Sequence, residues 1–158
     1  MRRGTFTSLV NDEFAFVKSC GFLIADKEIS IDGEVVRFAR GKFGFSVNFE
    51  RRDSSIMIWL CRLVANKFME NPVNIIDRSD IYNMCLDDFV FIKDPSRVVK
   101  QMYEYGESSG YYDGIDGYRR YVRLHADCFR DFGIDAIEDA SAHREVEQVI
   151  LSRRQKHE

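Results

Sequence analysis

Phe43-Gly44-Phe45-Ser46-Val47-Asn48-Phe49-Glu50 is the stretch that decides the fold. Its apolar side chains fall on every second position, which is the pattern of a strand with one buried face and one polar face. The next run, Ile56-Met57-Ile58-Trp59-Leu60-Cys61, is apolar on both faces, as expected for a central strand covered on both sides. Arg51-Arg52-Asp53-Ser54 joins the two strands as a polar hairpin turn.

Two more strands are predicted upstream of this hairpin. Glu34-Val35-Val36-Arg37-Phe38-Ala39-Arg40 is predicted to be a strand, and Gly41-Lys42 turns it into the next one. An edge strand is expected within residues 22–31, followed by a turn at Asp32-Gly33. The sheet is therefore predicted to be an antiparallel meander of about four strands. Its predicted core residues are Val36, Phe38, Phe45, Val47, Ile56, Ile58 and Trp59.

Apolar residues at helical spacing predict helices on both sides of these strands in the sequence. The clearest helical segments are residues 7–20, 117–133 and 141–154. Thr7 or Ser8 is expected to cap the first helix, and Gly133 is expected to end the second. Helices before and after a run of strands indicate an α+β fold, with an N-terminal helix and a C-terminal helical segment packed on the sheet. The length of 158 residues predicts a single domain, residues 1–158.

The region between the sheet and the long helix is predicted to be made of short elements. A short helix is expected over residues 79–85, and the apolar residues 89–92 are expected to form either a short strand or a core plug. Asp94-Pro95 is a typical helix start, and that helix is expected to reach Tyr105. Residues 106–117 are predicted to be a glycine-flanked loop.

Candidate metal ligands and catalytic residues stand apart from one another in the sequence. His125 and Cys128 are three residues apart, but no second pair completes the four ligands of a zinc site, so His125 is interpreted as a core histidine. His143-Arg144-Glu145 matches half of a zinc deaminase motif, without its PCxxC partner. Asp113-Gly114-Ile115-Asp116-Gly117 resembles a cation loop, but Leu124 stands where an EF-hand needs glutamate. No metal and no cofactor is predicted.

Cysteine usage and hydropathy favour a cytoplasmic protein. The four cysteines have no regular spacing: Cys20, Cys61, Cys85 and Cys128. Reduced thiols in a cytosolic protein are the interpretation that we prefer, and a disulfide framework is the alternative. No segment approaches the ~20 apolar residues of a membrane helix. The basic residues 1–5 lead to no apolar run of signal-peptide length.

Charge is distributed unevenly along the chain. Residues 77–116 hold nine acids and four bases, a net charge of −5, together with five tyrosines. Tyrosines among carboxylates suit a protein interface that meets a basic partner, whereas an ordinary solvated face with core tyrosines is the alternative. The overall charge of −3 disfavours nucleic acid as a direct ligand. The candidate partner-binding residues are Asp94, Glu104, Glu107, Tyr111, Tyr112, Asp113 and Asp116.

Three further features carry a resemblance. They are the turn Cys20-Gly21-Phe22 after the first helix, the strand meander over residues 35–58, and Tyr118-Arg119-Arg120-Tyr121 in the helical part that follows. In these features the chain resembles the small α+β immunity proteins of bacterial polymorphic-toxin and contact-dependent growth inhibition systems. The resemblance implies a non-enzymatic cytoplasmic protein that binds and neutralises a cognate toxin domain, with a basic nuclease as one such toxin.

Two other functions stay open at this stage. One is a hydrolase-like enzyme that uses dispersed carboxylates with His125 or His143. The other is a structural or regulatory subunit that uses the same acidic surface. A cavity that encloses a histidine beside a carboxylate would favour the enzyme, and a toxin-like gene directly upstream would favour the immunity protein. The sequence leaves the oligomeric state open.

Overall fold

Strands β2 (Gly33–Arg40), β3 (Phe43–Glu50) and β4 (Ser55–Arg62) form the predicted meander in the computed structural model, which describes residues 1–155. β1 (Leu23–Ile29) extends one edge of the sheet and β5 (Asn83–Cys85) extends the other. All neighbouring strands are antiparallel, in the order β1-β2-β3-β4-β5. The α+β fold is confirmed, with five strands rather than about four.

The fifth strand comes from residues 79–85, for which the prediction of a short helix is wrong. Only Arg78–Asp80 is helical, as one 3₁₀ turn capped by the Asp77 carboxylate. Met84 then lies opposite Leu60 of β4 and is buried. Pairing with the sheet edge and burial of Met84 outweigh the local helical signal, because strand formation depends strongly on tertiary context.

Side-chain alternation places the core on one face of the sheet. The inward residues of β2, β3 and β4 form buried cross-strand rows: Val36, Val47 and Ile58, then Phe38, Phe45 and Leu60. Ile56 is buried as predicted. Trp59 is partly buried but does not belong to this core. It alternates with Ile58 and Leu60 and therefore points to the opposite face of the sheet.

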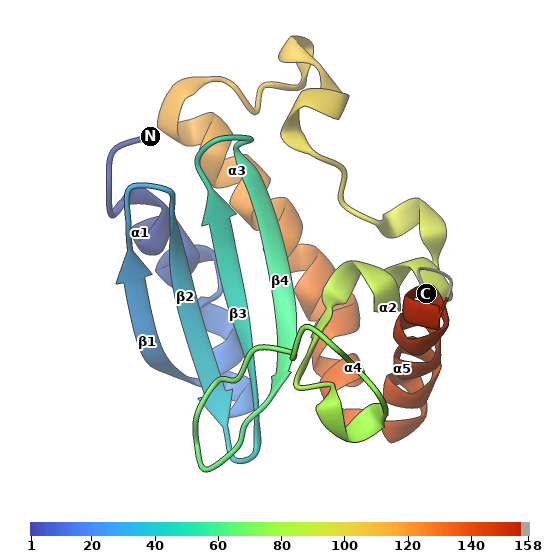
Figure 1. Ribbon diagram of the computed structural model, residues 1–158. Helices are drawn as coiled ribbons and strands as arrows, with labels where there is room; N and C mark the ends of the chain where they lie inside the picture. The colour runs from blue at the N-terminus through green and yellow to red at the C-terminus, as the bar shows by residue number, and fades with distance from the viewer. Residues whose placement is uncertain (156–158) are drawn as a thin grey trace.

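Helices α1 (Thr5–Glu13) and α3 (Gly114–Cys128) cover the inner face of the sheet (Figure 1). Aromatic rings fill the space between the layers. The ring centroid of Phe129 lies 4.1 Å from that of Phe45 and 6.0 Å from that of Phe14. The core therefore joins residues at the two ends of the sequence through the central strand β3.

The first helix is shorter than the predicted span of residues 7–20, and its predicted caps at Thr7 and Ser8 are wrong. Helix α1 begins at Thr5, and a 3₁₀ segment, Ala15–Cys20, follows it. Neither predicted hydroxyl caps the helix, because a carboxylate from the sheet takes that role.

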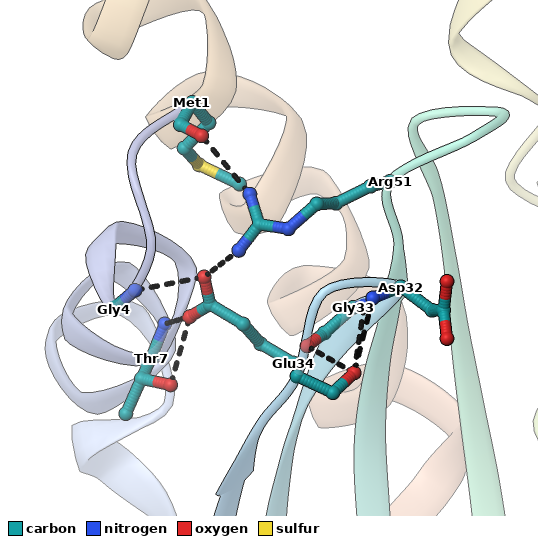
Figure 2. Close-up of polar contacts among 8 residues, drawn as sticks. Met1, Gly4, Thr7, Asp32, Gly33, Glu34 and Arg51 are labelled. Atoms are coloured by element: carbon teal, nitrogen blue, oxygen red, sulfur yellow. Dashed lines mark hydrogen bonds and ion pairs between the residues drawn. The ribbon is translucent and has the colours of Figure 1, made fainter.

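This carboxylate belongs to Glu34, which is buried at the start of β2. Its Oε1 accepts a hydrogen bond from the Gly4 N–H at 2.9 Å, and its Oε2 accepts from the N–H and the hydroxyl of Thr7, both at 3.0 Å (Figure 2). Arg51 donates to the same Oε1 at 2.8 Å and to the Met1 carbonyl at 3.0 Å. One side chain thus satisfies free N–H groups at the helix start and joins α1, β2 and the turn after β3.

Three more helices pack beside the sheet (Figure 1). α2 (Leu86–Lys93) contains residues 89–92, so the predicted strand or core plug is a helical turn. Phe89 and Val90 enter the core, whereas the next two residues are exposed, as the helical turn requires. α5 (Ala140–Gln155) packs against α2 and agrees with the predicted last helix.

Gly133 does not end the long helix as predicted. α3 continues through a π-helical turn, Phe129–Gly133, into α4 (Ile134–Glu138). A β-carbon at Gly133 would lie 2.3 Å from Cδ2 of Phe129. This glycine therefore makes room for the ring that packs on Phe45, rather than serving as a helix stop.

Phe45→Ala should lower the free energy of unfolding by ~3–5 kcal/mol, from the lost transfer energy of the ring plus the cavity left behind. The Phe45 side chain is 0% exposed. Phe43→Ala is the matched control on the same strand, because Phe43 is 37% exposed and should cost much less. Urea unfolding of both variants gives the comparison. Equal losses would contradict the assignment of Phe45 to the centre of the core.

Glu34→Ala should lower the free energy of unfolding by roughly 3 kcal/mol, because it leaves buried N–H groups and the Arg51 guanidinium without their acceptor. Glu50→Ala, at an exposed carboxylate of the neighbouring strand, should change it by less than about 0.5 kcal/mol. Guanidinium unfolding measures both, and amide hydrogen exchange should accelerate at Gly4 and Thr7 only in the first variant. A loss no greater than that of Glu50→Ala would show that Glu34 does not hold the helix.

Candidate functional site

The segment from Asp94 to Asp116 contains all of the predicted partner-binding residues and runs from the end of α2 across the top of Figure 1 to the start of α3. It is not the helix predicted from Asp94-Pro95, because its only helical parts before α3 are short 3₁₀ turns. These turns are Pro95–Arg97, Met102–Tyr105 and Glu107–Ser109. Val99 and Met102 are buried and attach the segment to the core.

Tyrosine rings in edge-on and tilted contact hold this segment on α3. The ring centroid of Tyr111 lies 5.2 Å from that of Tyr105 and 5.3 Å from that of Tyr121. The Tyr121 hydroxyl donates to the carbonyl of Lys100 at 2.8 Å, and the Lys100 N–H donates to the Tyr105 hydroxyl at 3.1 Å. Burial, and then the neighbouring Tyr105, raises the pKa of Tyr111, so the phenol remains neutral. Tyr111 is therefore an internal anchor of the segment.

Three of the predicted carboxylates are engaged within the segment or with α3. Asp94 accepts hydrogen bonds from the N–H and the hydroxyl of Ser96. Glu104 accepts from the N–H of Gln101 at 2.7 Å. Asp113 is bonded to Arg120 at 3.0 Å. These three side chains give the segment its shape, and within residues 1–155 Asp113 is the one of the three whose charge is paired with a base.

The rest of the predicted residues face outward. Glu107, Tyr112 and Asp116 are exposed, and no hydrogen bond or ion pair within residues 1–155 engages their side chains. Two exposed apolar side chains on the same segment, Tyr103 and Ile115, did not enter the predicted set. The sequence does carry a signal for Ile115, which is an apolar residue between two aspartates in a predicted loop.

The opposite face of the sheet carries a cavity. The loop between β4 and β5 crosses this face (Figure 1), and a cavity of about 770 Å³ lies between them. Sheet residues on its wall include Arg37, Ser46, Asn48, Trp59 and Cys61, and loop residues 66–71 complete it. Its volume falls in the range of about 300–1,000 Å³ that small-molecule sites occupy.

The sheet side of this cavity consists of neutral or paired groups, whereas the loop adds the exposed charged residues Lys67 and Glu70. Arg37 is bonded to Asp26 at 2.7 Å and to Glu28 at 3.1 Å. Burial raises the pKa of the Cys61 thiol to about 12, so the reactive thiolate is scarce near neutral pH. Asn48 Oδ1 is buried and accepts no hydrogen bond from residues 1–155. The Cys61 thiol is therefore a poor nucleophile, and the Asn48 oxygen is an unused acceptor.

The histidines that the enzyme alternative needs lie elsewhere. His125 is buried in the core against the Tyr121 ring, with centroids 4.9 Å apart. His143 packs against the rings of Phe43 and Phe89. In the part of the chain that the structure describes, the residues lining the cavity on the sheet and a smaller one beside α2 include neither histidine. Within the same residues, no three His, Cys, Asp or Glu side chains are grouped so as to hold a metal ion.

No protein-family model, no curated protein and no solved structure matches this chain significantly. Within residues 1–155, no helix has both the length and the apolar character needed to cross a bilayer. All four cysteines are free thiols.

Burial lowers the pKa of His125 to about 3, which predicts a pH-dependent contribution to stability. Below about pH 6.5 the unfolded chain binds a proton that the folded protein excludes, so this contribution falls with pH until about pH 3. Burial raises the pKa of Asp87 to about 6, and that carboxyl acts in the opposite direction. The informative quantity is therefore the difference between the native protein and His125→Phe.

The stability advantage of the native protein over His125→Phe should fall by about 2 kcal/mol between pH 6 and pH 4. Denaturant unfolding of both proteins at several pH values measures it. A difference independent of pH would mean that His125 accepts a proton in the folded protein as readily as in the unfolded chain.

Proposed function

We propose that this chain is an immunity protein that binds a cognate bacterial toxin domain and blocks it without chemistry of its own. The binding surface is the segment from Asp94 to Asp116, and its outward-facing side chains make the contacts. Two features support it: the resemblance of the sequence to immunity proteins, and the exposure of large side chains on this segment in the structure.

One observation carries the proposal. Tyr103 is 67% exposed, Tyr112 46% and Ile115 56%, and the exposed carboxylates of Glu107 and Asp116 belong to the same segment. Large aromatic side chains are the typical anchors of protein interfaces, and surrounding charges add steering and specificity.

The order of the segment supports the same interpretation. Binding costs less free energy when the binding groups are already held in place, because fewer side chains and loops lose freedom. Tyr111 packs between Tyr105 and Tyr121 of α3, and Arg120 donates to both the Gly110 carbonyl and Asp113. The outward-facing residues are thus displayed by a segment that ring contacts and hydrogen bonds hold on α3.

The acidic charge indicates the kind of toxin. Enzymes that act on nucleic acid neutralise phosphates with lysine and arginine. Residues 94–116 hold five acids against two bases, a net charge of −3, and the exposed carboxylates of Glu107 and Asp116 would face such a basic site. A basic nuclease is therefore the toxin class that this surface fits best.

The first test is co-purification with the product of the gene directly upstream, followed by binding measurements on variants. Tyr112→Ala should weaken binding by about 2 kcal/mol, or roughly 30-fold, if the ring is a central anchor. The double variant Glu107→Lys/Asp116→Lys should mainly slow association and reduce its salt dependence. Asp113 is left unchanged, because its pair with Arg120 holds the segment.

The control is the double variant Asp53→Lys/Glu145→Lys, which makes the same charge change at exposed positions outside the segment. Circular dichroism verifies folding, and growth of toxin-producing cells measures protection. Native-like binding by the folded segment variants would place the interface elsewhere. Absence of a complex, together with turnover of a small substrate, would favour the hydrolase-like alternative.

A further inference from the structure

A second cavity lies where α2, the π-helical turn, α4 and α5 meet, and its volume is about 230 Å³. Its apolar lining comes from Phe89, Phe132, Ala136 and Ala142. Its charged lining comes from Lys93, Asp131, Asp135 and Asp139. The volume is below the ~300 Å³ at which small-molecule sites begin, so the cavity is of a size for one side chain.

The three carboxylates of this cavity differ in how they are satisfied. Asp131 is bonded to Arg97 at 2.5 Å. Asp139 accepts hydrogen bonds from the N–H and the hydroxyl of Ser141, at 2.8 and 2.7 Å. The exposed carboxylate of Asp135 has no hydrogen-bond or ion-pair partner among residues 1–155. A cation that enters the cavity therefore meets an unpaired charge at Asp135.

Charge complementarity selects the occupant. From Asp131 to Asp139 the chain has four carboxylates and no base, so an anionic group is disfavoured here. An apolar lining with carboxylates at its edge matches a side chain with a methylene stem and a cationic head. One face of the Phe132 ring already carries the Arg97 guanidinium, 5.3 Å from its centroid, which favours the more slender lysine over a second planar group.

We propose that this cavity receives a lysine side chain of the protein partner. The methylene stem packs on Phe89 and Ala142, and the ammonium group pairs with Asp135 and Asp139. The inference rests on the proposed function in one respect, namely that the partner is the basic toxin domain.

The position of the cavity would allow one partner to contact both the cavity and the segment from Asp94 to Asp116. Lys93 lines the cavity and directly precedes Asp94, the first residue of that segment. Arg97 of the segment is bonded to Asp131 of the cavity. The two surfaces are thus joined by the chain and by an ion pair, so one partner can span both.

Lys93 gives the proposal a directional test. Its ammonium group is the one basic group among the cavity-lining residues that the structure describes, and it repels an incoming cation. Removing it should strengthen binding of a cation, whereas removing a carboxylate should weaken it. A merely structural role for these residues predicts no such opposite pair of effects.

The experiment is an NMR titration of the whole protein with n-butylammonium chloride, a mimic of the lysine side chain, at constant ionic strength. Signals of Ala136 and Ala142 should shift saturably. The dissociation constant should rise about fivefold in Asp135→Asn, the effect of one exposed ion pair, and should fall in Lys93→Ala. Glu145→Gln, at an exposed carboxylate on α5 outside the cavity, should leave it unchanged.

Two further measurements define failure. The neutral probe n-butanol should give weaker shifts, and Ala142→Leu should abolish the ammonium response by filling the cavity. Shifts that do not saturate, equal shifts with butanol, or an unchanged response in both Asp135→Asn and Lys93→Ala would overturn the proposal. Because the titration uses no toxin, its failure removes this lysine site alone, whereas failure of the proposed function appears as absence of a toxin complex.

Discussion

The buried carboxylate of Glu34 holds the amino-terminal helix against the sheet. Burying a charge is costly unless it is paired and hydrogen-bonded, and here Arg51 and the groups at the start of α1 supply the partners. With α1 fixed in this way, Phe6 stacks on Phe49 with centroids 5.1 Å apart, and Phe14 reaches the ring of Phe129. A polar contact thus sets the position from which the apolar core is built.

The aromatic core then determines the course of the carboxy-terminal half. Phe129 packs on Phe45, and Gly133 leaves the space that its ring requires, so the long helix passes through a π turn and continues into α4. π turns are frequent at functional sites. In this molecule the turn contributes Asp131 and Phe132 to the smaller cavity. The packing that stabilises the fold therefore also shapes a recess on its surface.

The two faces of the sheet and the segment beside it have different roles. One face carries the core, and the other faces a cavity that the loop between β4 and β5 covers. The segment from Asp94 to Asp116 is irregular but attached, since Met102 is buried and the Tyr111 ring packs against Tyr121. Binding residues are commonly displayed in this way, on loops held by a rigid scaffold. The side chains of Tyr103 and Tyr112 are exposed and take no part in this attachment.

The sequence by itself determined the antiparallel meander, because alternation with period two is a local property that burial on one face enforces. It also located the acidic, tyrosine-rich segment, since composition is read directly from the chain. Only the tertiary structure decided that Glu34 caps α1, that Asp113 forms an ion pair with Arg120, and that residues 83–85 are a strand. Each of these depends on partners distant in the sequence or on which neighbour a segment meets. The smaller cavity could not be predicted either, because its lining comes from separate helices that only the fold brings together.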